Sequence, residues 1–150
     1  MIRARNFPIL MLILTAFLLA ACSPANSATA PVEPELITLV ATDIAYDKTQ
    51  LEVELGRPVR VTLDNQGALD HDFSIEEIST SGEIIVDADE MDGHDMGHVA
   101  EEPEVHVAAM SGGSSTIEFT PAEAGEYEYY CTVLGHREAG MEGTLIVREP

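Results

Sequence analysis

Residues 129–141 read YYCTVLGHREAGM and carry three different metal-binding side chains on one short stretch. Cys131, His136 and Met141 follow one another with four residues between each successive pair. A thiol, an imidazole and a thioether are donors of graded softness, and such sulfur and nitrogen ligands suit copper. The stretch lacks a second imidazole. We expect the fold to bring one to it, and the candidate is His71, sixty positions upstream of Cys131.

Short segments on both sides of this stretch alternate apolar and polar residues with a period of two. Strict alternation predicts β-strands that bury one face, and turn-forming residues separate successive segments. The segments are a short apolar run at 36–41 and alternating residues at 51–55, 59–64, 71–75, 117–120, 127–131 and 143–148. Many short strands without a helical period predict an all-β fold, a Greek-key β-sandwich.

Residue parity predicts which candidate ligands face the core. His71 shares its parity with Phe73 and Ile75, so it should point inward from the start of a strand. Cys131 shares its parity with Tyr127 and should point inward from the end of another strand. Tyr127 follows an Ala-Gly turn and is typical of a tyrosine corner, whose hydroxyl ties down the adjoining loop. A plain core aromatic is the alternative interpretation.

The first 21 residues differ in composition from the rest of the chain. Arg3 and Arg5 form a basic start, and residues 7–20 are largely apolar. This run is short of the roughly 20 residues that a membrane-spanning helix needs, so it predicts a secretory signal peptide at 1–21. Cys22 follows Leu-Ala-Ala and resembles the acylated cysteine of bacterial lipoproteins. A chance cysteine after an ordinary signal peptide is the alternative.

Residues 22–35 are small, polar and proline-rich, which predicts a flexible tether ahead of a domain at 36–150. A lipid at Cys22 would anchor that domain to a bacterial membrane, at its periplasmic or extracellular face. It would also leave Cys131 without a disulfide partner, because the chain has two cysteines. Metal ligation would protect such an exported thiol from oxidation.

The chain is strongly acidic, with 27 acidic and 7 basic residues and a formal net charge of −20. This charge argues against nucleic acid or an anionic membrane surface as partner. Two interpretations remain open. The acidity could steer the protein toward a basic redox partner, or it could adapt the whole surface to high salt. The single lysine and the even spread of carboxylates suit the second interpretation.

Three segments resemble the cupredoxins, a family that includes plastocyanin and azurin: 70–73 (DHDF), 127–131 (YEYYC) and 135–143 (GHREAGMEG). The spacing of the C-terminal loop is similar to that of auracyanin-type and sulfocyanin-type members. The resemblance covers nearly all of residues 36–148. It implies a type I (blue) copper protein that passes single electrons between redox partner proteins and is not an enzyme. We expect it to be a monomer.

Carried over from the family, the copper ligands would be the imidazoles of His71 and His136, the Cys131 thiolate and, at a longer distance, Met141. The alternatives are that His71 is an ordinary buried histidine and that Met141 is a core residue. Asp72 departs from the asparagine that many relatives have after the first histidine. Its backbone N–H can still donate to the Cys131 sulfur, but its carboxylate cannot donate as an amide would. The departure bears on the reduction potential.

An acidic insertion at about 79–104 also separates this chain from small cupredoxins. Within it, two methionines and two histidines lie close together and form a second candidate copper site: Met91, His94, Met96 and His98. The alternative is a flexible acidic loop in which these residues are incidental. The nearby residues 105–107 alternate, so His106 is expected on a strand and facing solvent.

Three functional hypotheses follow. The first is a lipid-anchored type I copper electron carrier at the outer face of a bacterial membrane. The second is an extracytoplasmic copper chaperone or storage protein that uses the insertion as its main site. The third is a metal-free sandwich that acts as an adhesion or interaction module, and the spacing of Cys131, His136 and Met141 argues against it.

Overall fold

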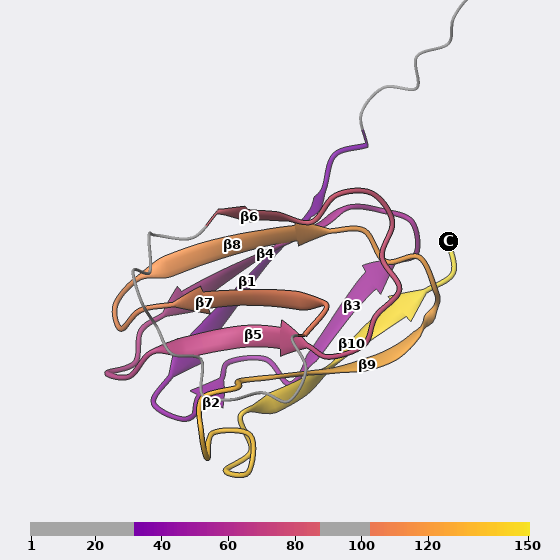
Figure 1. The fold of residues 1–150 in the computed structure, drawn as a ribbon. Coiled ribbons are helices and arrows are strands. Elements are labelled where there is room, and N and C mark those ends of the chain that lie inside the picture. The colour runs from indigo at the N-terminus through magenta and orange to yellow at the C-terminus, as the bar shows by residue number, and fades with distance from the viewer. Residues whose placement is uncertain (1–31, 88–102) are drawn as a thin grey trace, which may run out of the picture. The chain divides into compact units, whose positions relative to one another are not determined.

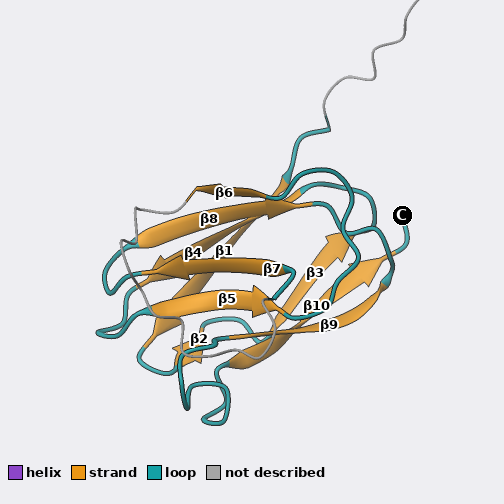
Figure 2. Ribbon diagram, in the orientation of Figure 1, coloured by secondary structure: helices purple, strands orange, loops and turns teal. Residues whose placement is uncertain are grey.

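The computed structural model, which describes residues 32–87 and 103–150, has ten strands there (Figures 1 and 2). They include the predicted segments and two short strands, Ala45–Tyr46 and Ile85–Asp87, that the sequence analysis did not predict. Across these residues the chain consists of strands and loops, and no helix there is long and apolar enough to cross a membrane. The strands are β1 (Glu35–Thr42), β2 (Ala45–Tyr46), β3 (Gln50–Glu54), β4 (Val59–Asn65), β5 (His71–Ile75), β6 (Ile85–Asp87), β7 (Val105–Ala109), β8 (Ser114–Phe119), β9 (Gly125–Tyr130) and β10 (Glu142–Arg148).

The strands form two five-stranded sheets, in the orders β2-β1-β4-β8-β6 and β3-β10-β9-β5-β7. Strand β1 runs parallel to β4, and β3 runs parallel to β10, whereas the other paired strands are antiparallel. The predicted all-β fold is therefore confirmed. The two parallel pairs join strands that are not neighbours in sequence, so local alternation could not predict them.

The core lies between the sheets and is made of the side chains of one parity. In β4, Val59, Val61 and Leu63 are fully buried, while Arg60 between the first two is exposed. Strand β5 differs because all five of its residues are buried. Its residues of both parities are buried, so the side chains on both faces of this strand are covered. This places His71 in a buried position, as predicted.

Two details bear on segments that the sequence analysis singled out, the insertion and Tyr127. Strand β6 lies within the expected insertion at 79–104, and it pairs with β8 although all three of its residues are exposed. The Tyr127 hydroxyl donates a hydrogen bond to the Glu123 carbonyl at 3.1 Å, which confirms the predicted tyrosine corner.

Several predictions fall outside the described residues. They are the signal peptide at 1–21, the lipidated Cys22 with most of the tether at 22–35, and the second candidate copper site of Met91, His94, Met96 and His98. These predictions stay predictions.

Candidate metal centre

His71, Cys131 and His136 meet at one end of the sandwich, although they come from three parts of the chain. His71 is the first residue of β5, Cys131 directly follows β9, and His136 lies in the loop between β9 and β10. Their nearest ligand atoms all lie within 4.8 Å of one another, and all three residues are buried. Among the described residues, this is the one group of His, Cys and carboxylate side chains with metal-binding geometry.

The distances within this group fit a metal ion. The Cys131 Sγ lies 3.5 Å from the Nδ1 of His136 and 3.9 Å from the Nδ1 of His71. Metal bonds of about 2.0 Å to imidazole nitrogen and 2.3 Å to thiolate, as in zinc sites, would separate these atoms by about 3.7 Å at trigonal angles. Two imidazoles and one thiolate around a shared centre form the ligand set of a blue-copper site.

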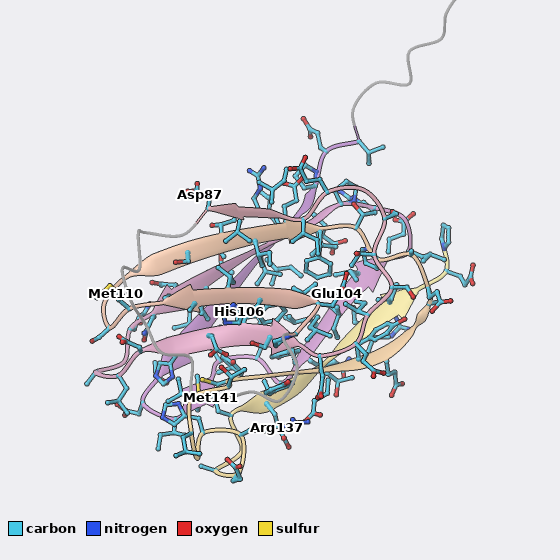
Figure 3. The ribbon with its side chains drawn as sticks, in the orientation of Figure 1. Asp87, Glu104, His106, Met110, Arg137 and Met141 are labelled. Carbon is cyan, nitrogen blue, oxygen red and sulfur yellow. The ribbon has the colours of Figure 1, made fainter. Side chains whose placement is uncertain are left out.

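Met141, the fourth predicted ligand, lies at the point where the loop returns to the sheet (Figure 3). Its backbone N–H donates to the His136 carbonyl at 2.9 Å, and its carbonyl accepts from the Cys131 N–H at 3.1 Å. The side chain is fully buried. The backbone thus holds Met141 against two of the three clustered residues, and its thioether is the fourth candidate ligand near the site.

The loop that carries His136 is folded by its own hydrogen bonds. The His136 N–H donates to the Val133 carbonyl at 3.0 Å, and the Gly140 N–H donates to the Arg137 carbonyl at 2.9 Å. Gly135 and Gly140 have φ angles of 85° and 98°, a region that side chains other than glycine rarely adopt. The local sequence therefore fixes the turns of the loop without help from a metal.

A buried asparagine shapes the turn that precedes His71. The Asn65 side-chain amide donates to the carbonyls of Leu69 and Ala109 at 2.8 and 2.9 Å, and its oxygen accepts from the Gly67 N–H at 3.0 Å. A Cβ at Gly67 would lie 3.0 Å from the His71 Nε2, so a side chain there would press on the ring. Residues 65–67 predict a turn from the sequence alone, but sequence analysis missed that the Asn65 side chain also bonds to Ala109 on β7.

In the metal-free protein, the imidazole of His71 and the thiol of Cys131 differ in whether they must lose a proton before they can bind a metal. Burial lowers the pKa of His71, and the neighbouring His136 lowers it further. The ring is therefore neutral at pH 7 and able to offer a lone pair. Burial raises the pKa of the Cys131 thiol to about 11, and the Asp72 charge contributes. The backbone N–H groups of Asp72 and Val133 lower this pKa in part, in agreement with the expected Asp72 contact.

The Asp72 carboxylate is buried and connects β5 to the residue after Cys131. It accepts hydrogen bonds from the Thr132 N–H at 2.8 Å, from the Thr132 hydroxyl and from the Ser74 hydroxyl at 3.1 Å. These contacts hold the carboxylate in one orientation between β5 and the residue after Cys131. Sequence analysis missed Thr132, because nothing in its local pattern shows that its N–H and hydroxyl meet the same side chain.

The prediction for His106 is wrong in part. It lies on β7 as expected, but its Nε2 is buried, 3.9 Å from an Asp72 carboxylate oxygen, and its side chain is only 25% exposed. The alternation of β7 correctly placed His106 on the face opposite Val105 and Val107. That face is only partly open to solvent at this position, and the ring nitrogen lies near the Asp72 carboxylate of the neighbouring strand.

Comparisons with known proteins agree with this geometry. A family model described as copper-binding proteins of the plastocyanin/azurin family matches residues 36–148. A copper-resistant cuproprotein, CopI of Rubrivivax gelatinosus, is 36% identical over 104 residues, which are 69% of this chain and 59% of that protein. The chain thus spans less than two thirds of that relative.

Two solved structures share the fold. Reduced auracyanin of Roseiflexus castenholzii aligns with a TM-score of 0.56 at 24% identity, covering 75% of this chain and 96% of that one. Auracyanin A of Chloroflexus aurantiacus aligns with a TM-score of 0.57 at 23% identity, covering 77% and 100%. At these identities the likeness speaks for the architecture alone.

Proposed function

Because the chain belongs to the plastocyanin/azurin family of copper-binding proteins, we propose that it is a type I copper electron carrier, with His71, Cys131, His136 and Met141 as ligands. The observation that carries the proposal is the buried cluster of two Nδ1 atoms and one Sγ at separations of 3.5 and 3.9 Å. When bound, copper supplies a one-electron Cu(II)/Cu(I) couple. Since this role transforms no substrate, the proposal does not include an enzymatic activity.

The residues around the cluster suit this role because they hold the ligands in place. His71 belongs to a strand buried on both faces, and Cys131 and Met141 are joined by a backbone hydrogen bond. His136 sits in a loop with internal hydrogen bonds. Ligands that cannot move far impose similar positions on both oxidation states, which limits the rearrangement that accompanies the loss or gain of one electron.

The surface near His136 offers a contact area for a redox partner. Leu134, in the same loop, is 93% exposed, and Leu69, two residues before His71, is 51% exposed. An apolar contact on a strongly acidic chain favours a partner with an apolar centre and a basic rim. We propose that such partners donate and accept the electron, and that the protein acts as a monomer.

The proposed setting is the outer face of a bacterial membrane, periplasmic or extracellular. A signal peptide at 1–21 and a lipid on Cys22 would anchor the domain through the tether at 22–35. The test is fractionation of cells that express the full chain or its Cys22→Ala variant. We expect the former with the membranes and the latter released; a variant that stays with the membranes would contradict anchoring through Cys22.

A copper chaperone or storage protein is the second candidate function. The specific observation in its favour is the relative named as a copper-resistant cuproprotein. The candidate site of Met91, His94, Met96 and His98 would then be the main copper site.

The two functions differ in what the copper-loaded full chain does. An electron carrier should bind one copper tightly, show intense thiolate-to-copper absorption that reduction bleaches reversibly, and exchange electrons rapidly between copies. Replacing Cys131 by Ser should abolish the colour and leave the fold intact, whereas deleting residues 91–98 should leave the spectrum nearly unchanged. Colourless copper(I) that is lost on this deletion would instead support the chaperone.

A further inference from the structure

Arg137 directly follows the candidate ligand His136, yet its guanidinium reaches back to the sheet. Its Cζ lies 3.9 Å from the centre of the Tyr130 ring. Its Nη2 forms an ion pair with one Glu128 carboxylate oxygen, and its Nε donates to the other at 3.3 Å. Its Nη1 lies 4.0 Å from a Glu76 carboxylate oxygen. Figure 3 shows this side chain between the loop and the sheet.

These contacts join the loop to both strands that carry the other ligands. Glu128 and Tyr130 belong to β9, and Tyr130 immediately precedes Cys131. Glu76 follows β5, the strand that begins with His71. The Tyr130 hydroxyl also meets the Glu76 carboxylate at 3.5 Å. One side chain of the loop thus contacts two residues of β9 and the residue that follows β5.

The chemistry of these contacts favours arginine at this position. An exposed single ion pair contributes little, because solvent and salt screen it. Here one guanidinium makes a two-point contact with a carboxylate and also lies on an aromatic face, which adds geometric specificity to the charge. The hydrogen bond with Glu128 raises the pKa of Arg137. A lysine would keep the charge but lose the planar fork.

We propose that Arg137 is a positioning residue for His136: its clasp on Tyr130, Glu128 and Glu76 fixes the ligand loop against the strand that leads to Cys131. The proposal rests on the proposed function only in taking His136 as a copper ligand. Without the clasp, the loop retains its internal turns but moves more freely relative to β9. His136 then leaves the site more often.

The chain provides a matched control. Arg148 forms a similar exposed two-point contact with Glu52, with its Nε and Nη2 at 2.9 and 2.8 Å from the two carboxylate oxygens. This pair lies at the end of β10 away from the loop. Arg137→Gln and Arg148→Gln therefore remove the same charge and a similar ion pair, but only the first alters the clasp.

Two measurements on the full chain test the proposal. The first is amide hydrogen exchange of residues 133–141 in the metal-free protein. The second is the rate of copper(I) transfer to excess bathocuproine disulfonate. We expect Arg137→Gln to speed exchange in this loop and to raise copper release roughly three- to tenfold. Arg137→Lys should recover part of the difference, and Arg148→Gln should match the parent protein.

Equal behaviour of Arg137→Gln and Arg148→Gln in both measurements would overturn the proposal. So would faster exchange throughout the sandwich, because that result would mean a general loss of stability. Electron self-exchange of the parent protein, measured by NMR line broadening, tests the carrier function separately. If self-exchange is absent but Arg137→Gln still speeds copper release, the carrier proposal fails and the role of Arg137 stands.

Discussion

At the scale of the residue, Asp72 places a buried negative charge beside the candidate copper ligands. Its carboxylate accepts hydrogen bonds from Thr132 and Ser74, and its charge raises the pKa of the Cys131 thiol. The same charge should favour Cu(II) over Cu(I). We therefore expect Asp72→Asn to raise the reduction potential by roughly 50–100 mV, or about 1–2 kcal/mol, as measured by redox titration of the visible absorption.

A control separates this effect from the overall acidity of the chain. Glu52→Gln removes a carboxylate on β3, paired with Arg148 at the other end of the sheet. Its potential should stay close to that of the parent protein. If Asp72→Asn left the potential unchanged or lowered it, the charge of Asp72 would not be what sets the potential of the copper.

The raised pKa of Cys131 predicts how copper binding depends on pH. Below about 11 the thiol of the metal-free protein keeps its proton, and copper must displace it. His71 needs no such step at neutral pH, because its pKa is lowered. We expect the apparent copper(I) affinity to rise about tenfold per pH unit between roughly pH 7 and pH 10, as measured by competition with a chelator at several pH values.

The metal-free protein should show the opposite trend in stability at high pH. The unfolded thiol ionises near its ordinary pKa of 9.0, whereas the folded thiol ionises near 11. Between these values the unfolded state has already lost a proton that the folded state retains, so stability falls as the pH rises. For the affinity prediction above, a copper affinity that did not change with pH would contradict the assignment of a buried, protonated Cys131.

At the scale of the element, strand β10 depends on a glycine that makes room for a tyrosine. A Cβ at Gly143 would lie 2.3 Å from the Cζ and Oη of Tyr129 on the paired strand β9. That ring cannot easily move, because its hydroxyl donates to the Lys48 carbonyl at 2.6 Å and its face packs on Tyr46 and Phe73. The pair therefore fixes how closely β9 and β10 approach each other.

We expect Gly143→Ala to lower the free energy of unfolding by about 1–3 kcal/mol, since the methyl group overpacks this site. Urea denaturation of the metal-free protein measures the change. Gly125→Ala is the matched control, because a Cβ there would first meet the Tyr127 hydroxyl oxygen at an ordinary 3.4 Å. Equal stability of the two variants would mean that β9 and β10 adjust without strain.

The elements also show how far the sequence alone could lead. Alternation predicted the strands that carry the core, and parity predicted that His71 and Cys131 point inward, because both are local properties of a pleated chain. Alternation and parity could not predict the strand order, since the parallel pairs β1 with β4 and β3 with β10 depend on contacts between distant segments.

The same limit applies to the candidate site. The loop spacing and the resemblance predicted the residues that cluster there, because their chemistry is unusual. The residues that hold them have ordinary chemistry. Asn65, Thr132 and Arg137 act through partners that lie up to 61 positions away in the sequence, and no local pattern shows that the fold will bring those distant partners together.

At the scale of the whole molecule, the excess of acidic residues is the dominant electrostatic feature. The chain has a formal net charge of −20, and several of its few cations are already matched with carboxylates. Arg60 pairs with Glu118, Arg137 with Glu128 and Arg148 with Glu52. Most of the remaining acidic side chains therefore repel one another, and this repulsion favours the unfolded state because it separates the charges.

Salt should therefore stabilise the domain. The distance over which exposed charges interact shortens from about 30 Å at 0.01 M salt to about 8 Å at 0.15 M. We expect the urea midpoint of the metal-free protein to rise most steeply over this range. If general repulsion is the cause, sodium chloride and potassium chloride should act alike and the rise should level off near physiological salt. A rise that continues steeply to molar salt would favour adaptation of the whole surface to high salt. A midpoint that did not change with salt would mean that the carboxylates are spaced too widely to repel one another. The steering of a basic partner would then explain the excess of acidic residues better. In that case the rate of association with the partner should fall as salt is added.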